Sequence, residues 1–276
     1  MSATQISQTV VNDGNSLHRV VSQQEWLQER LALLEKEKAQ TRMRDELNAE
    51  RLALPWVKVE KEYIFDGPRG KVSLSDLFDG RSQLFIKHFM MGPGATTQCV
   101  GCSLEVDHIE GVLVHLENHD VSYVSVARAP MDEIEVVRKR MGWKFRWVSS
   151  YGNDFSYDFG GSFRPEEMAA GAATYNYRQI KPEIADLSGN SAFYKDADGQ
   201  IYHTYSTFGR GPEPVLGIYG ILDMMPKGRN ENGPYHTLGD WVRLNHVYGK
   251  GGTVEANGRY SVPHSESPSG SKCGCA

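Results

Sequence analysis

The stretch QLFIKHFMMGPGATTQCVGCSLEV, residues 83–106, decides the fold of this 276-residue chain. Its first part, Gln83 to Met90, is nearly continuous in apolar and aromatic residues, which is typical of a buried parallel strand. Gly92-Pro93-Gly94 then breaks the strand, and Cys99 and Cys102 follow at the start of an apolar stripe with helical spacing. The pattern therefore predicts a strand, a loop and a helix, with Cys-x-x-Cys at the junction.

The following segments continue this alternation of strands and helices. The stripe of the first helix recurs at steps of four and three residues, so one helix is expected through Leu116. A second strand is expected over 121–127, then a helix from Pro130 to Gly142, then a third strand over 145–148. The stripe consists of Cys102, Val106, Ile109, Leu113 and Leu116.

An antiparallel hairpin is expected over 191–195 and 200–206, followed by a closing helix over 215–225 and a short helix over 241–248. Parallel strands with helical crossovers, then a hairpin, then a helix, follow the thioredoxin-like plan. The predicted fold is therefore a thioredoxin-like α/β domain, with a mixed central sheet flanked by helices.

Four segments are expected along the chain. Residues 1–21 are polar and without period, which predicts a disordered N-terminus, and residues 22–54 predict a helical arm that starts with a capping box at Ser22 and Glu25. The thioredoxin-like domain covers residues 55–248, beginning with a strand over 57–65. Residues 249–276, rich in Gly and Ser, predict a disordered, flexible tail that ends in Cys-Gly-Cys.

The helical arm leaves two interpretations open. Its apolar stripe shifts around the helix between Leu34 and Ala39, so it is not a sustained heptad. That irregularity favours a solvated helix packed along one face of the domain. The alternative is an arm for docking, which would form a homodimer through the N-terminal helix.

The composition excludes several classes of protein. The formal net charge is −5, whereas a nucleic-acid-binding domain carries an excess of basic residues. The chain contains no run of 18 apolar residues, the length that a membrane-spanning helix needs. Residues 1–21 lack the pattern of a secretory signal. We expect a cytoplasmic protein with neither a nucleic-acid nor a membrane partner.

The cysteines carry the predicted chemistry. The chain has two tight pairs, and in a reducing compartment such pairs are redox-active or metal-binding. Cys102 falls on the buried stripe, while Cys99 precedes the helix, where the helix dipole lowers the pKa of a thiol. We expect Cys99 to be the nucleophile and Cys102 the resolving thiol. A zinc site made of both pairs ranks lower, because Cys273 and Cys275 are distant and mobile.

Four further residues are candidates near the thiols. Thr96 follows Pro93 and precedes Cys99 with a spacing close to the peroxiredoxin pattern, and Arg128 lies at the carboxyl end of the second strand, where it could stabilise a thiolate. His88 and His203 could act as bases or, with the cysteines, hold copper or zinc. Thr96 and Arg128 could equally be ordinary structural residues, and for each histidine alone a hydrogen-bonded position in the core is favoured.

The sequence resembles the thioredoxin-like family called domain of unknown function 899, predicted to be a dithiol–disulfide oxidoreductase. The resemblance implies a thioredoxin-like fold and thiol redox activity over about residues 26–248. It rests on these motifs: 33–38 (LLEKEK), 54–59 (LPWVKV), 77–84 (LFDGRSQL), 88–90 (HFM), 99–103 (CVGCS), 128–130 (RAP), 140–143 (RMGW), 147–150 (WVSS) and 203–206 (HTYS).

Two differences from thioredoxin itself are informative. Thioredoxins carry Trp-Cys-Gly-Pro-Cys, whereas this chain has Gln98-Cys-Val-Gly-Cys102. Thioredoxins also place a cis-proline just before the strand opposite the site, where this chain has Gly189-Asn190-Ser191. Because that proline shapes the groove for protein substrates, its absence argues against ordinary protein-disulfide exchange.

The sequence thus predicts a thiol–disulfide oxidoreductase that takes a thiol or disulfide substrate and a reductant, with no cofactor and no bound metal. The alternatives are a thiol peroxidase acting on peroxides, a metal-binding or metal-delivery protein, and a binding module with an inactive site. The tail could also reach the domain, so that Cys273 and Cys275 relay electrons to the disulfide of Cys99 and Cys102.

Overall fold

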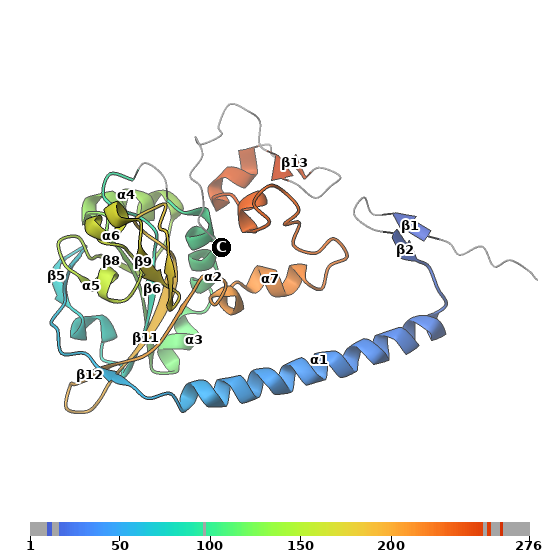
Figure 1. Cartoon of the computed structure of the whole chain (residues 1–276), viewed down its shortest axis with the longest axis horizontal. Helices are drawn as coiled ribbons and strands as arrows, with labels where there is room; N and C mark the ends of the chain where they lie inside the picture. The colour runs from blue at the N-terminus through green and yellow to red at the C-terminus, as the bar shows by residue number, and fades with distance from the viewer. Residues whose placement is uncertain (1–9, 13–16, 96–97, 251–252, 255–259, 262–276) are drawn as a thin grey trace, which may run out of the picture.

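The structure, a computed structural model, describes residues 10–12, 17–95, 98–250, 253–254 and 260–261. Its centre is an eight-stranded mixed sheet with helices on both faces (Figure 1). The strands, in their order across the sheet, are β3 (Val57–Lys58), β12 (Ile201–Phe208), β11 (Gly189–Lys195), β6 (Gln83–His88), β7 (Val121–Ala127), β8 (Arg146–Ser149), β4 (Ile64–Gly67) and β5 (Gly70–Ser73).

The four central strands give the thioredoxin topology. β6 and β7 are parallel, from Gln83 beside Val121 to His88 beside Val126. β11 runs antiparallel to β6 and pairs with β12 as the predicted hairpin. The order β7-β6-β11-β12, with the crossover helix carrying the cysteines between β6 and β7, confirms the thioredoxin-like fold.

Helices cover the two faces of this sheet unequally. α2 and α4 pack on one face, where Cys102, Val106 and Ile134 join a core with aromatic residues of β6–β8. The opposite face packs on Phe155 of α5 and on the short 3-10 helix η1 (Ser75–Phe78). The α-helices are α1 (Gln23–Leu52), α2 (Val100–Ile109), α3 (Leu113–Asn118), α4 (Met131–Met141), α5 (Phe155–Asp158), α6 (Pro165–Ala170) and α7 (Gly217–Leu222).

The single helix expected from Cys102 to Leu116 is two helices, and that prediction was wrong. α2 ends at Ile109 and α3 begins at Leu113. Between them stands Gly111, a poor helix former. Glu110 also accepts the backbone N–H groups of Lys144 and Phe145, which ties this bend to the chain leading into β8. Leu113 is consequently only partly buried at the edge of the core.

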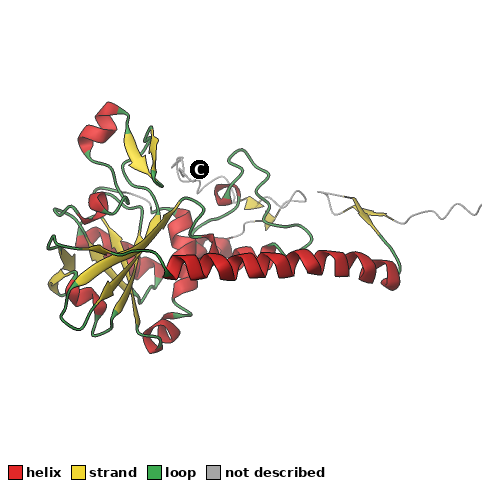
Figure 2. Ribbon diagram, turned by 60° about the horizontal axis from the view of Figure 1, so that its bottom comes forward, coloured by secondary structure: helices red, strands yellow, loops and turns green. Residues whose placement is uncertain are grey.

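The helical arm begins as predicted but does not pack along the domain. Ser22 and Glu25 form the capping box, and α1 runs for 30 residues with no buried side chain. Figures 1 and 2 show it extending away from the sheet. Its carboxyl end touches the domain where the Arg51 guanidinium lies 5.7 Å from the Tyr205 ring centre. The interpretation of a helix packed along one face is therefore wrong, and the homodimer contact stays a prediction.

Several boundaries differ from the predicted ones. The strand expected over 57–65 is two strands, β3 and β4, which lie near opposite edges of the sheet. The closing helix expected over 215–225 is a turn of 3-10 helix, η2 (Glu213–Val215), followed by α7. The helix expected over 241–248 is replaced by the 3-10 segments η3 (Leu238–Asp240) and η4 (Asn245–Lys250). Glycine and proline in residues 209–239 favour such short turns.

Short strand pairs occur outside the main sheet. In the stretch predicted to be a disordered N-terminus, β1 (Val10–Asn12) pairs with β2 (Leu17–Arg19). The predicted tail contains β13 (Thr253–Val254) and β14 (Tyr260–Ser261), while Cys273 and Cys275 lie outside the described residues. A two-residue turn joins β9 (Ala173–Tyr175) to β10 (Arg178–Ile180). Across the described ranges, no helix is both long and apolar enough to cross a membrane.

We expect the core on the α2 face to dominate stability. Ile134 of α4 is fully buried in it, so Ile134→Ala should lower the free energy of unfolding by about 2–5 kcal/mol. Leu113→Ala, at the partly buried edge, should cost less. The measurement is urea denaturation followed by circular dichroism. Val136→Ala, on the exposed face of the same helix, is the control, and an equal loss at Val136 would contradict this packing.

Candidate functional site

The loop after β6 delivers Cys99 to the start of α2. Cys99 is the N-cap residue, with extended backbone angles, and its sulfur accepts the backbone N–H of Cys102 at 3.4 Å. The first turn is fixed further because the Ser103 N–H and hydroxyl both donate to the Cys99 carbonyl, at 3.0 and 2.8 Å. A sulfur at a helix N-terminus with a donor aimed at it is favoured in its anionic form.

The two thiols differ in burial as the helical stripe predicts. Cys99 is partly buried, whereas Cys102 is 1% exposed within the core. Burial raises the pKa of the Cys102 thiol well above its ordinary value, and the adjacent Cys99 sulfur raises it further. Cys99 is therefore the accessible sulfur of the pair, and Cys102 is held protonated beneath it.

A buried ion pair lies beside the thiols. Lys87 of β6 is 0% exposed and donates to the carboxylate of Glu105, one helical turn after Cys102. The Lys87 ammonium also donates to the Ser188 hydroxyl at 2.6 Å, just before β11. Burial alone would lower the pKa of Lys87, but the nearby Glu105 carboxylate and the two cysteine sulfurs together raise it above its ordinary value. The pair therefore joins β6, α2 and the start of β11.

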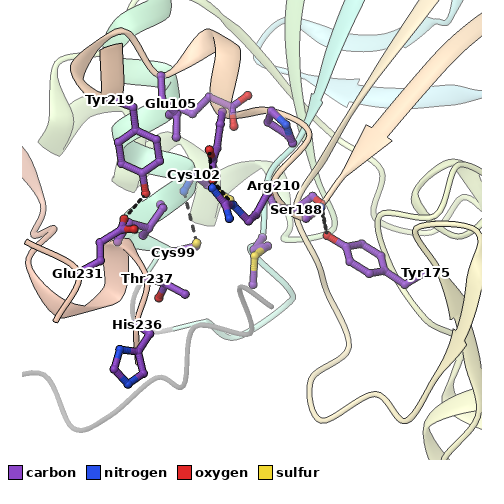
Figure 3. Close-up of a pocket in the computed structure, with 17 residues that line it drawn as sticks. Cys99, Cys102, Glu105, Tyr175, Ser188, Arg210, Tyr219, Glu231, His236 and Thr237 are labelled. Carbon is purple, nitrogen blue, oxygen red and sulfur yellow. Dashed lines mark hydrogen bonds and ion pairs between the residues drawn. The ribbon is translucent and has the colours of Figure 1, made fainter. Parts of the chain in front are cut away.

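A cavity of about 170 Å³ opens onto both sulfurs. Cys99, Cys102, Glu105 and Ser188 line it from the thioredoxin core (Figure 3). Ten of its 17 lining residues come instead from the segment after β12: Gly209, Arg210, Pro212, Glu213, Leu216, Tyr219, Glu231, His236, Thr237 and Leu238. This segment, residues 209–245, is called the cover below.

The cover is packed on α2 along its length. Leu238 is so close to Gly101 that a Cβ there would lie 3.2 Å from the Leu238 side chain. The Ile218 N–H donates to His108 Nε2 at 3.1 Å, and the Asn245 amide donates to Asp107 at 2.9 Å. Val242 is fully buried. Gly101, Asp107 and His108, from both ends of α2, thus lie against the cover, which makes the cover part of the site.

Arg128 is not at the thiols in this structure. It lies just after β7 and forms a two-pronged ion pair with Asp186, at 2.6 and 2.9 Å, and it also donates to the Tyr157 hydroxyl at 3.1 Å. It lines a different cavity, together with Pro93 and Tyr157. Thr96, Cys273 and Cys275 lie outside the described residues.

The structure brings His88 and His203 toward each other but not to the cysteines. Because strand side chains alternate, Lys87 points to the α2 face and His88 to the opposite face, where its ring stacks on Phe155. His88 Nε2 is 2.8 Å from the Ser191 hydroxyl, which is 2.7 Å from the Ser206 hydroxyl, itself 2.7 Å from His203 Nε2. In the part of the chain that is described, no three His, Cys, Asp or Glu side chains could hold a metal ion.

Sequence reasoning missed Glu105, Ser188 and the cover. One signal pointed to Glu105: Lys87 interrupts an otherwise apolar strand, and a buried cation needs an anion. Glu105 lies three residues after Cys102, toward the same side of the helix. The cover left no comparable signal in its sequence.

The sheet order and a Cys-x-x-Cys at the β6–α2 junction define a member of the thioredoxin-like class of proteins. Residues 15–248 match the model of a family described as a bacterial protein of unknown function, DUF899, and the chain belongs to that family. No curated protein matches the chain.

Several solved structures resemble this one at low identity. Peroxidoxin BcpB from Mycobacterium tuberculosis is 13% identical with a TM-score of 0.40, covering 59% of this chain and 94% of its own. Peroxiredoxin Q from Xanthomonas campestris is 14% identical with a TM-score of 0.36, over 56% and 88%. A putative protein disulfide isomerase from Bacteroides thetaiotaomicron is 17% identical with a TM-score of 0.35, over 67% and 99%.

The buried ion pair gives a direct prediction. Lys87→Met would leave the Glu105 carboxylate buried without its partner, so we expect a loss of about 3–5 kcal/mol in the free energy of unfolding. The double variant Lys87→Met/Glu105→Leu removes both charges and should recover most of that loss. Urea denaturation of the three proteins measures the difference. A single-variant loss as small as that of an exposed pair, or a double variant less stable than the single, would contradict this arrangement.

Proposed function

We propose that this protein is a thiol-dependent redox enzyme in which Cys99 is the nucleophile and Cys102 the resolving thiol. The observation that supports it best is the pair's geometry. The accessible Cys99 sulfur caps α2 and accepts an N–H, and Cys102 lies one turn later beneath it, at the wall of the same cavity. A metal-binding role has no comparable support among the described residues.

With a disulfide substrate the reaction balances as follows. The Cys99 thiolate attacks one substrate sulfur, forms a mixed disulfide and releases the other half as a thiolate. Cys102 then loses its proton and attacks the Cys99 sulfur, which releases the second half. The substrate is reduced to two thiols and the protein dithiol is oxidised to a disulfide. A thiol reductant returns the protein to its starting state.

The second step needs an acceptor for the Cys102 proton, because burial keeps that thiol protonated. Glu105 is placed for this. It lies one turn after Cys102, lines the same cavity, and its Oε1 is buried without a hydrogen-bond partner. Lys87 remains on the other carboxylate oxygen, Oε2, and would hold Glu105 in place during the transfer. We assign Glu105 as the proton acceptor for Cys102.

A peroxide is the second candidate substrate. The Cys99 thiolate would attack the terminal peroxide oxygen, release the alcohol and become a sulfenic acid, and Cys102 would then close the disulfide with loss of water. The cover favours small substrates of either kind. It lines most of the cavity in front of the sulfurs, and that cavity has a volume of only about 170 Å³, which leaves little room for a folded protein loop and its disulfide.

Apolar residues of the cavity restrict the class of substrate further. Leu216 and Leu238 of the cover line the cavity together with Met90, which follows β6. Tyr219 is held in place by its hydroxyl, which donates to Glu231 at 2.6 Å. Arg210 is already paired with Glu213, at 2.5 and 3.1 Å. We therefore propose low-molecular-weight substrates with an apolar part, such as an organic hydroperoxide or a small disulfide, and not protein disulfides.

The assignment of the two sulfurs is tested by alkylation. Brief treatment of the reduced protein with iodoacetamide at mildly acidic pH should label Cys99 ahead of Cys102, because the Cys102 pKa is raised by burial. Peptide mass mapping measures the ratio. With a small disulfide, the Cys102→Ser variant should accumulate a mixed disulfide on Cys99. The Cys99→Ser variant should form no mixed disulfide on Cys102. Labelling of Cys102 first, or no disulfide between the two after oxidation of the native protein, would exclude the proposed function.

Substrate size is tested separately. The native protein should turn over dipropyl disulfide or cumene hydroperoxide, with dithiothreitol as reductant, at least tenfold faster than it reduces insulin. Leu238→Ala/Tyr219→Ala should open the cover and reduce that preference. Val136→Ala, on the exposed face of α4, is the control. If insulin were reduced as fast as the small substrates, the proposed limit on substrate size would be wrong. The proposed roles of the two cysteines would not be affected.

A further inference from the structure

A second groove lies on the face of the sheet opposite the cysteines, and neither cysteine lines it. It has a volume of about 400 Å³ and is bounded by the chain between β3 and β4, the end of α5, the β9–β10 hairpin and β12. Its lining includes Val57, Tyr63, Phe159, Tyr177, His203 and Ser206, and we call it the His203 groove. A second hollow of about 480 Å³ shares Val57, Tyr177, His203 and Ser206 with it, so the groove continues along β12.

His203 presents a defined hydrogen-bond acceptor to this groove. Its Nε2 is 3.1 Å from the Tyr205 carbonyl oxygen, which can only accept, and we therefore assign the ring hydrogen to Nε2. Burial lowers the pKa of His203, so the ring is neutral near pH 7 and Nδ1 keeps a lone pair. Among the described residues Nδ1 has no hydrogen-bond partner, and it is not one of the atoms sealed from solvent.

The ring of His203 is also held in one orientation. Phe159 and Phe193 contact it with ring centres 5.2 and 5.4 Å away. The Ser206 hydroxyl at 2.7 Å continues through Ser191 to His88 inside the core. A neutral imidazole fixed this way from behind, with its other nitrogen open, is a preorganised recognition group.

Tyr177 adds a strained side chain at the groove wall. Asn176 and Tyr177 form the turn of the β9–β10 hairpin with φ angles of 48° and 61°, a conformation that favours glycine at the second position. A tyrosine in this conformation is strained, because its Cβ crowds the following carbonyl oxygen. The Tyr177 hydroxyl donates to the Ser206 carbonyl at 2.9 Å, yet its residue is 74% exposed. A strained and exposed aromatic residue at a cavity wall indicates a binding role.

The charges of the groove are already neutralised. Lys61 is paired with Asp158 and with Asp154, at 2.8 and 2.6 Å, and the Tyr63 hydroxyl donates to Asp158 at 2.8 Å. On the rim, Lys58 and Glu60 have opposite charge. The groove thus offers aromatic faces and one neutral acceptor, without an unbalanced charge that would attract an ion.

We infer that the His203 groove binds a neutral aromatic molecule of one or two rings, whose hydroxyl or N–H donates to His203 Nδ1. The rings would lie among Tyr63, Phe159 and Tyr177. This site is separate from the thiols, so its ligand need not be a substrate of the redox reaction. A pocket that aligns one acceptor within aromatic walls rejects analogues that lack the donor, because the acceptor is then buried without a partner.

Indole and N-methylindole test this inference, because they share the rings and differ in the donor. Isothermal titration calorimetry on the full-length protein at pH 7.5 should show indole binding at least tenfold more tightly. In ¹⁵N-histidine NMR spectra, indole should shift the His203 Nδ1 resonance. Affinity should fall as the pH is lowered, because protonation of Nδ1 removes the acceptor.

Two variants and a control complete the test. His203→Phe keeps an aromatic ring and should bind the two probes equally. Tyr177→Gly should lower the affinities for indole and N-methylindole by a similar factor, while it stabilises the turn. His115→Phe, at an exposed position of α3, should leave both affinities unchanged. Equal affinity of the native protein for indole and N-methylindole, the absence of binding by both, or indole preference retained in His203→Phe would overturn the inference.

Discussion

The ion pair between Lys87 and Glu105 is the interaction on which the arrangement of the site depends. It places a cation from the central strand and an anion from the cysteine helix inside a core where neither could remain charged alone. Because Lys87 also donates to Ser188, the same ammonium fixes the chain that enters β11. The successive elements β6 and α2 are thus held in register with the distant start of β11, at the point where the sulfurs meet the cavity. A shift of α2 along the sheet would separate the pair, which makes the geometry of Cys102 a consequence of charge pairing as well as of apolar packing.

The cover restricts the approach of a partner protein to the cysteines of this thioredoxin-like fold. In an open site, a partner protein can lay an extended segment across the helix N-terminus. Here residues 209–245 occupy that approach, and their contacts with Gly101, Asp107 and His108 connect them to the cysteine helix itself. The absence of proline before β11 is consistent with this arrangement, since no groove for a protein segment has to be shaped there.

The cysteine cavity and the His203 groove lie on different faces of the sheet, and Tyr175 stands between them. It lines both the cysteine cavity and the His203 groove. Its hydroxyl donates to the Ser188 carbonyl at 2.6 Å and accepts the Gly209 N–H at 2.9 Å. These bonds reach the residue that contacts Lys87 on one side and the first residue of the cover on the other. A ligand in the groove would therefore lie one side chain away from the groups that position the thiols.

The sequence by itself determined the elements whose causes are local. The spacing of Cys99, Cys102 and the apolar stripe predicted the junction, the capping box set the start of α1, and Pro130 and Gly142 bounded α4. The alternation of Lys87 and His88 along β6 is equally local, and it already implied that the two side chains face opposite ways. Topology followed from the order of these elements, because short crossovers leave few ways to pair the strands.

The tertiary structure alone decided which distant groups meet. In the tertiary structure Arg128 forms an ion pair with Asp186, and His203 forms a hydrogen bond with Ser206. A segment more than 100 residues later in the chain lines the cavity in front of Cys99. Such pairings depend on which surfaces remain unburied after the sheet has formed, and on the geometric match between them. A local pattern of residue types encodes the surface that a segment offers, but it does not encode the partner. That is why the position of Cys99 and Cys102 at the start of α2 could be predicted from the sequence, while the cover and the second groove could not.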